Sequence, residues 1–148
     1  MFEDIYREFS GLFGSNLAEH LRGWDEAAGD YAKTNLFSIV GIIALATALV
    51  ACVTYYYILN HPRQNRWQKW MFFWLLPVAV VNFFVAFGIT YKDVLADNIS
   101  SDIAQVSWLK CLGFGFVNFI VSAIFFTLIS FVIHWGSRNC KYSPFIKF

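Results

Sequence analysis

Three long apolar stretches alternate with short polar segments along the chain. The stretches run from Asn35 to Leu59, from Trp67 to Tyr91 and from Cys111 to Trp135. A helix needs about 20 apolar residues to cross the hydrocarbon core of a bilayer, and each stretch exceeds that length. Positions 70–91 and 111–135 contain no Lys, Arg, Asp or Glu, whereas an amphipathic helix of a soluble protein keeps a polar face. The pattern predicts transmembrane helices at about residues 35–59, 67–91 and 111–135.

A shorter helical pattern precedes the first stretch. Its apolar residues recur at spacings of three and four, which form a helical stripe: Phe2, Ile5, Phe9, Leu12, Phe13, Leu17, Leu21 and Trp24. We expect Gly11 and Gly14 to divide the segment into two helices. A capping box from Asn16 to Glu19 is expected to start the second helix, and Gly29 to end it. These helices would lie on the membrane surface or pack against a neighbouring subunit.

The predicted fold is an all-α membrane protein in three parts. These are an extracytoplasmic segment (1–34) with one or two short amphipathic helices, a three-helix transmembrane domain (35–135) and a basic cytoplasmic tail (136–148). The composition of 58% hydrophobic and 14% charged residues agrees, because soluble domains have about 45–50% apolar and about 25% charged residues. Pro77 is expected to kink the second helix. Three helices enclose little space, so we expect a homo-oligomeric helical bundle.

The charged residues separate according to the side of the membrane. The N-terminal segment and the second loop share one side, which carries all ten acidic residues and five Lys and Arg. The first loop and the tail share the other side, which has no acidic residue and six basic ones: Arg63, Arg66, Lys69, Arg138, Lys141 and Lys147. The positive-inside rule places the N-terminus outside and the tail in the cytoplasm. We expect a bacterial inner (cytoplasmic) membrane, with the basic residues as contacts for a cytoplasmic protein or anionic lipid.

Aromatic side chains stand at the ends of the stretches. Such rings are typical of the headgroup region, and the two largest groups are Tyr55, Tyr56 and Tyr57, and Trp67, Trp70 and Trp74. The tryptophans also lie beside basic residues, a combination that binds single-stranded nucleic acid in other proteins. Because they share one helix face where an uncharged stretch begins, we prefer headgroup contact. Nucleic acid is therefore not an expected partner, whereas the lipid bilayer is.

Asn82 and Asn118 are the most informative polar residues within the stretches. They fall at similar depths in the second and third spans, so they are able to meet. An amide in hydrocarbon needs a partner, and inter-helix hydrogen bonds of this kind contribute about 0.6 kcal/mol on average. Two interpretations stay open. The asparagines form either a clamp between helices of one chain or a polar ring in an oligomeric pore, extended by Ser122, Thr127 and Ser130.

The first stretch has a face of small residues, whose members are Gly41, Ala44, Ala48 and Cys52. Small residues at these spacings let another helix approach closely. The three cysteines are widely spaced and form no CxxC pair, so neither a zinc site nor a disulfide framework is predicted. His134 lies at the cytoplasmic end of the third stretch and is expected to be solvated or bonded to a neighbour.

The sequence offers no catalytic chemistry. A nucleophile with a base, a metal set and a phosphate-binding loop are all lacking, so we expect neither an enzyme nor a bound cofactor or metal. The first functional hypothesis is a homo-oligomeric pore or channel-like component that alters membrane permeability. The predicted topology resembles that of three-span phage holins, and the resemblance extends to no sequence motif. The alternative is a membrane-embedded sensor, immunity or accessory subunit, for example of a bacterial defence system, that docks a partner on its basic cytoplasmic face.

Overall fold

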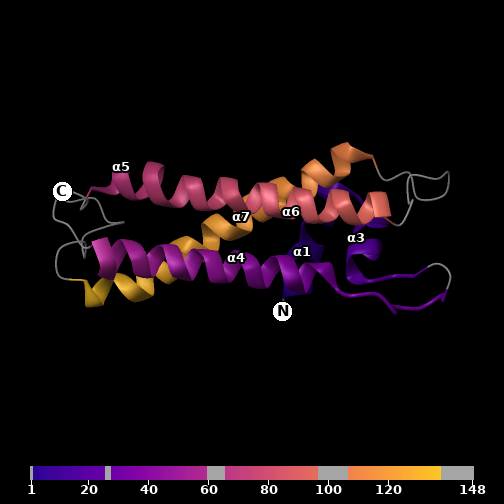
Figure 1. Ribbon diagram of the computed structural model, residues 1–148, viewed down its shortest axis with the longest axis horizontal. Helices are drawn as coiled ribbons and strands as arrows, with labels where there is room; N and C mark the ends of the chain where they lie inside the picture. Colours follow the sequence, from indigo (N-terminus) through magenta and orange to yellow (C-terminus); the bar gives the residue numbers. More distant parts are fainter. Residues whose placement is uncertain (1, 26–27, 60–65, 97–106, 138–148) are drawn as a thin grey trace. The chain divides into compact units, whose positions relative to one another are not determined.

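Long helices dominate the protein (Figure 1). The computed structural model describes residues 2–25, 28–59, 66–96 and 107–137, and the part of the chain that it describes contains no β-strand. The long helices are α4 (Leu36–Val53), α6 (Leu76–Ala96) and α7 (Trp108–Ile133). Each long helix adjoins a helical stretch of different pitch. A π-helical stretch, Thr54–Leu59, follows α4, and a 3-10 turn, His134–Gly136, follows α7. A short helix, α5 (Trp67–Trp70), and a π-helical stretch, Met71–Leu75, precede α6.

Within the described residues, three continuous helical segments are long and apolar enough to cross a membrane. They are Leu36–Leu59, Trp67–Leu95 and Trp108–Gly136. The predicted all-helical fold with three helices of transmembrane length is therefore confirmed. Pro77 has no N–H to donate, and its ring collides with the preceding turn of a regular helix. A π-helical stretch, Met71–Leu75, ends two residues before Pro77, so the helix is locally widened in the preceding turn.

Three short helices precede α4: α1 (Phe2–Glu8), α2 (Ser10–Phe13) and α3 (Ser15–Arg22). The chain breaks at Gly14, as predicted, whereas Gly11 lies inside α2. The predicted capping box is wrong because α3 already begins at Ser15, which leaves Asn16 within the helix. Gly29 is not the end of the helix either. Gly23 ends it in a left-handed conformation with φ of 104°, which glycine adopts without the steric cost of a Cβ.

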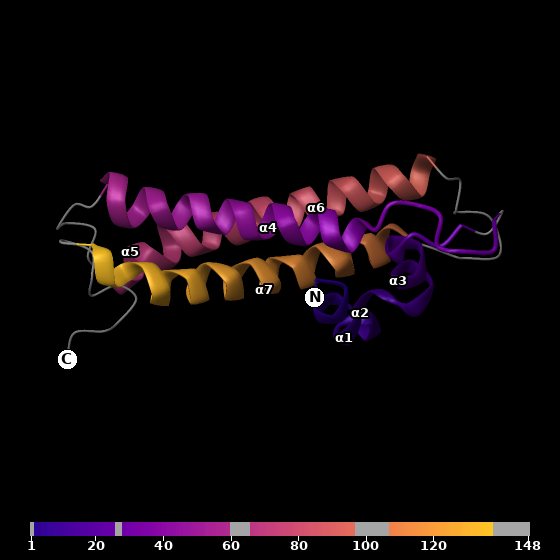
Figure 2. The ribbon, with the colours of Figure 1, turned by 90° about the horizontal axis from the view of Figure 1, so that it is seen from below.

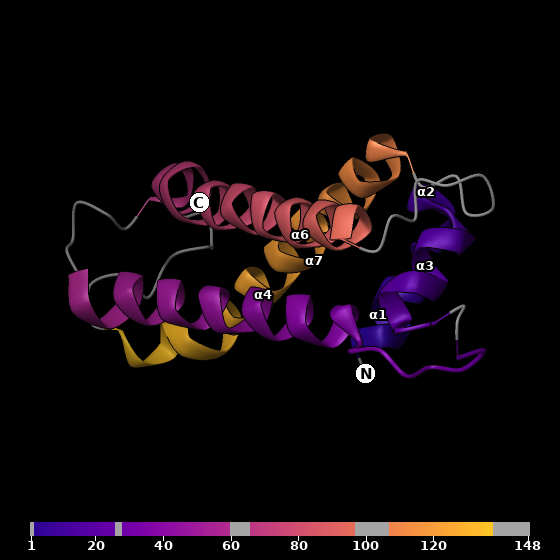
Figure 3. The same ribbon diagram turned by 45° about the vertical axis from the view of Figure 1, so that its right-hand side comes forward.

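The chain divides into two compact units. The first comprises residues 1–42 and 83–118, and the second comprises residues 43–82 and 119–148. In the first unit, the short helices pack on the beginnings of the long ones. Figure 3 shows α1 beside the start of α4, where the Tyr6 ring stacks on Phe37 at 5.5 Å. Figure 2 shows α2 and α3 beside the first turns of α7, where Phe13 and Phe114 meet edge to face at 5.3 Å.

The second unit has its own apolar core, made of Ala48, Cys52, Tyr55, Tyr56, Trp70 and Phe126. Three of these aromatic residues were expected among the headgroups and lie in the protein interior instead. Trp70 is 7% exposed, and Tyr55 and Tyr56 are fully buried. The interior position of Trp70 is stabilised because its indole N–H donates to Ser130 Oγ at 3.2 Å, so a large ring is buried with its polar atom bonded. Trp67 and Tyr57 remain exposed.

Candidate functional site

Asn118 is bound from outside the long helices. The hydroxyl of Tyr6 in α1 donates a hydrogen bond of 2.6 Å to Asn118 Oδ1 in α7, and both side chains are completely buried. The Tyr6 ring also contacts Phe37 and Phe114, and its burial raises the pKa of the Tyr6 hydroxyl. A buried amide with such a partner ties α1 to α7 within the first unit.

Asn82 is bound within the second unit. Its Nδ2 group donates to Thr47 Oγ1 of α4 at 2.8 Å and to the Val78 carbonyl of α6 at 2.9 Å. The Thr47 hydroxyl lies 2.9 Å from the Ile43 carbonyl, to which it donates. The Asn82 amide therefore links α6 to α4 and is completely buried. Sequence reasoning identified both asparagines but neither of these partners, and the predicted meeting of the two amides stays a prediction.

Two of the hydroxyl groups proposed to extend a polar lining, those of Ser122 and Thr127, are bonded to backbone. The third, Ser130 Oγ, accepts from the Trp70 indole N–H. Ser122 donates to the Phe119 carbonyl at 3.0 Å, and Thr127 donates to the Ala123 carbonyl at 2.8 Å. Both acceptors lie one turn earlier in α7, which is the usual way in which such hydroxyls are satisfied in membrane helices. Ser122 is completely buried and Thr127 is half-buried.

The face of small residues on α4 is buried in both units. Ala44, Ala48 and Cys52 have no exposed surface. The Cys52 thiol lies 3.5 Å from the Phe126 carbonyl of α7. In the first unit, a Cβ added to Gly41 would lie 2.5 Å from a ring carbon of Phe2. This face packs closely against α7 and α1 of the same chain.

The predicted cytoplasmic contacts are described only in part. Arg66 is exposed and Lys69 is half-buried. The others, Arg63, Arg138, Lys141 and Lys147, lie outside the described residues. His134 is 8% exposed, and its Nδ1 atom lies 3.2 Å from the Ser130 carbonyl, so its neighbour is the backbone of its own helix.

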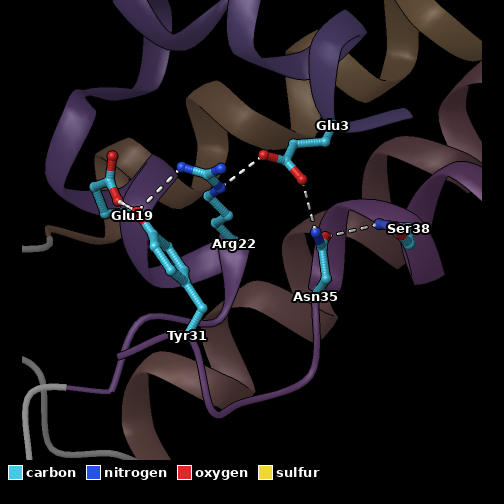
Figure 4. A network of polar contacts seen from close by, with 6 residues as sticks. All are labelled: Glu3, Glu19, Arg22, Tyr31, Asn35 and Ser38. Atoms are coloured by element: carbon cyan, nitrogen blue, oxygen red, sulfur yellow. Dashed lines mark hydrogen bonds and ion pairs between the residues drawn. The ribbon is translucent and has the colours of Figure 1, made fainter. Parts of the chain in front are cut away.

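A polar network joins the short helices to the segment before α4 (Figure 4). Arg22 Nε in α3 lies 2.7 Å from Glu3 Oε1 in α1. The other oxygen of Glu3 accepts from Asn35 Nδ2 at 3.2 Å. Asn35 in turn accepts from the Ser38 N–H at 3.2 Å, which satisfies one of the free donors at the start of α4. The network therefore fixes the beginning of α4 against α1.

Tyr31 extends this network toward solvent. Its hydroxyl accepts from Arg22 Nη1 at 3.1 Å and donates to Glu19 Oε2 at 2.6 Å. The hydrogen bond to Glu19, together with partial burial, raises the pKa of Tyr31. The Arg22 guanidinium carbon also lies 4.5 Å from the centre of the Tyr31 ring, a cation–π contact.

A cleft of about 200 Å³ opens beside the network. Its charged lining residues are Glu3, Arg7, Glu19 and Arg22, and Ser10, Ser15, Ala18 and Phe37 complete it. A second contact on this unit joins α3 to α6, where His20 Nε2 lies 2.6 Å from Asp93 Oδ2. Sequence reasoning treated the N-terminal charges only as an orientation signal, so this cleft was missed.

The described residues contain no group of three His, Cys, Asp or Glu side chains that could hold a metal ion. The described part of the chain is helical and has three helices long and apolar enough to span a membrane. By length and composition these helices indicate a multi-pass membrane protein. Comparison with protein-family models, with curated proteins and with solved structures found no match for the chain.

Proposed function

We propose that the protein is a non-enzymatic membrane subunit that acts by binding another component, as a sensor, immunity or accessory subunit. One observation carries the proposal. From Leu36 to Leu59, from Trp70 to Tyr91 and from Cys111 to Trp135, every exposed side chain is aliphatic or aromatic. Such an apolar surface is suited to contact with lipid. Polar and charged groups that a partner can recognise are therefore concentrated outside the spans.

The same observation bears on the pore hypothesis. A conducting lumen is generally lined by backbone carbonyls or by charged and polar side chains. The asparagines at similar depth are completely buried within the chain, which favours a clamp within one chain over a polar ring. An oligomeric pore would require these side chains to turn outward or the helices to separate.

The partner-binding face remains the basic one. Arg66 is exposed at the start of the second span, and the acid-free first loop and tail carry the other basic residues. An acidic cytoplasmic protein or anionic lipid fits this charge. In this proposal the N-terminus lies outside, and the chain resides in a bacterial inner membrane, where it serves a defence or competition system.

The homo-oligomeric pore is a second candidate because α7 carries an apolar hollow. The hollow has a volume of about 330 Å³. Its lining residues are Phe119, Ile120, Ala123, Ile124, Thr127 and Leu128. Ala123 and Thr127 are small, so a helix of a second copy can approach closely there. Assembly through this hollow would be the first requirement of a pore.

Reconstitution of the full-length protein in liposomes separates the two candidates. A binding subunit gives no ion flux or dye release above that of protein-free liposomes. A photoreactive residue introduced at position 66 should also cross-link the binding subunit to a cytoplasmic protein. The same residue introduced at position 91, at the opposite end of the span, should not. Dye release that rises steeply with protein concentration, and that Ala123→Leu abolishes while Ile124→Leu does not, would contradict the first candidate and support the pore.

A further inference from the structure

The cleft beside the polar network is lined by a carboxylate and a guanidinium that can each bind a further charged group. Both carboxylate oxygens of Glu3 are used, one by Arg22 and the other by Asn35. Among the described residues, the Glu19 carboxylate accepts a hydrogen bond only at Oε2, from Tyr31, so its second oxygen can accept another. No carboxylate among the described residues lies within ion-pair distance of Arg7, which is exposed. The cleft therefore offers one carboxylate oxygen and one guanidinium to a ligand.

The cleft lies where the first span begins. Phe37, which lines it, is the second residue of α4, and the apolar helical segment of transmembrane length starts at Leu36. The start of a transmembrane segment lies near the headgroups of the bilayer. An arginine and a carboxylate at this level would meet the phosphates and amines of lipids.

The size of the cleft suits a lipid headgroup. A volume of about 200 Å³ equals the space of about seven water molecules in the liquid. A phosphate joined to an ethylammonium group has about eight non-hydrogen atoms, so it fills a space of this order. The hydroxyl of Ser10 also lines the cleft and can donate to a phosphate oxygen.

We propose that this cleft binds a zwitterionic group in which a primary ammonium and a phosphate share a short linker, as in the headgroup of phosphatidylethanolamine. Arg7 takes the phosphate, because a guanidinium donates two parallel hydrogen bonds to such an anion. Glu19 accepts a hydrogen bond from the ammonium. The inference goes beyond the proposed function and does not depend on it, since a pore-forming protein would hold the same cleft.

The charges also predict which lipids the cleft rejects. Phosphatidylcholine has a quaternary ammonium without an N–H, so it cannot donate to Glu19. Phosphatidylglycerol lacks a cation, so it leaves Glu19 without an ammonium partner and places a headgroup of net negative charge beside that carboxylate. Phosphatidylethanolamine alone of the three offers both a phosphate to Arg7 and an N–H donor to Glu19.

Native mass spectrometry of the detergent-solubilised full-length protein tests the proposal. The protein is incubated with equimolar phosphatidylethanolamine, phosphatidylcholine and phosphatidylglycerol of distinguishable acyl mass. We expect preferential retention of phosphatidylethanolamine, reduced by methylation of its amine. Equal retention of the three lipids, or preference for phosphatidylglycerol, would overturn the proposal without any need for a variant. A separate arm with soluble phosphoethanolamine in lipid-free micelles distinguishes the sources, since saturable binding there assigns the site to a soluble ligand of the same chemistry.

Two exposed lining residues provide the variants. Arg7→Ala and Glu19→Gln each remove one charge-assisted interaction, so each should weaken phosphatidylethanolamine retention by about tenfold. Lys92→Ala and Glu8→Gln are the matched controls, because both residues are exposed, belong to the first unit and do not line the cleft. Far-ultraviolet circular dichroism checks that each variant keeps its helices. If the controls weaken retention as much as the cleft variants do, binding is not located in the cleft.

Discussion

The hydrogen bond between Tyr6 and Asn118 can be removed with almost no change in shape. Tyr6→Phe deletes one hydroxyl from a completely buried ring and leaves Asn118 Oδ1 without the donor that now lies 2.6 Å away. A neutral hydrogen bond contributes about 0.5–1.5 kcal/mol net, and a buried acceptor left without its donor costs about 1–3 kcal/mol. Because the ring keeps its contacts, we expect the free energy of unfolding to fall by about 1.5 kcal/mol.

The structure supplies a matched control for this substitution. The Tyr57 hydroxyl lies 3.4 Å from its acceptor, the Ile133 carbonyl, and the side chain is 50% exposed. A long bond at an exposed position contributes little, so Tyr57→Phe should change the free energy of unfolding by less than about 0.5 kcal/mol. Any general effect of losing a tyrosine hydroxyl would appear in both variants.

Equilibrium unfolding in mixed micelles, followed by circular dichroism, measures these free energies. Trypsin cleavage after Arg7 and Arg22 reports separately whether the short helices leave the long ones, and Tyr6→Phe should speed it. Combining Tyr6→Phe with Asn118→Leu should destabilise by less than the sum of the single changes, with a coupling of about 1 kcal/mol. Additive effects, or a Tyr6→Phe variant as stable as Tyr57→Phe, would refute the argument that this bond ties α1 to α7.

Three further predictions follow from other contacts. Asn82→Leu and Thr47→Val should each destabilise by about 1 kcal/mol, but together by little more than the larger effect, because they share one hydrogen bond; a double-mutant cycle measures this. Gly23→Ala should destabilise by about 1 kcal/mol or more, because φ is 104° and a Cβ would lie 2.3 Å from a carbonyl oxygen. Gly88 has open space around it, so Gly88→Ala should leave the thermal unfolding temperature unchanged or raise it. Burial raises the pKa of Tyr6, so its contribution to stability is constant below the unfolded pKa of about 10 and declines as pH rises above it; alkaline titration of unfolding should show a smaller decline in Tyr6→Phe.

The number and character of the long helices could be predicted because a membrane imposes them. A span must be apolar over its whole length, and this requirement leaves a signal that needs no knowledge of neighbours. Glycine alone predicted breaks at both Gly11 and Gly14, of which the structure has the one at Gly14. The end of α3 was not predictable, because Gly23 and Gly29 are equally good stop signals by type. Only the packing of the following loop, which approaches Gly23 closely, selects between them.

The partners of the polar residues could not be predicted from local sequence. Hydropathy gives the depth of Asn118 in a span, yet its partner Tyr6 is 112 positions away in the short helix α1. Trp70 fits an interfacial anchor equally well by position and type. Its burial depends on a hydroxyl of α7, Ser130, which accepts the indole N–H. Long-range pairing of this kind is a property of the packed helices, and no periodicity in one segment encodes it.

The short helices hold each long helix at its polar end within the first unit. Tyr6 bonds to Asn118 of α7, Glu3 bonds to Asn35 at the start of α4, and His20 contacts Asp93 near the end of α6. The binding proposed for the cleft, which Glu3 lines, would therefore act on residues that fix the ends of the long helices. Coupling through these contacts does not require polar side chains on the exposed surface of the spans, where the exposed side chains are aliphatic or aromatic. This coupling supports the proposed role as a membrane-embedded subunit that binds a partner, because it needs no polar lining on the exposed surface of the spans.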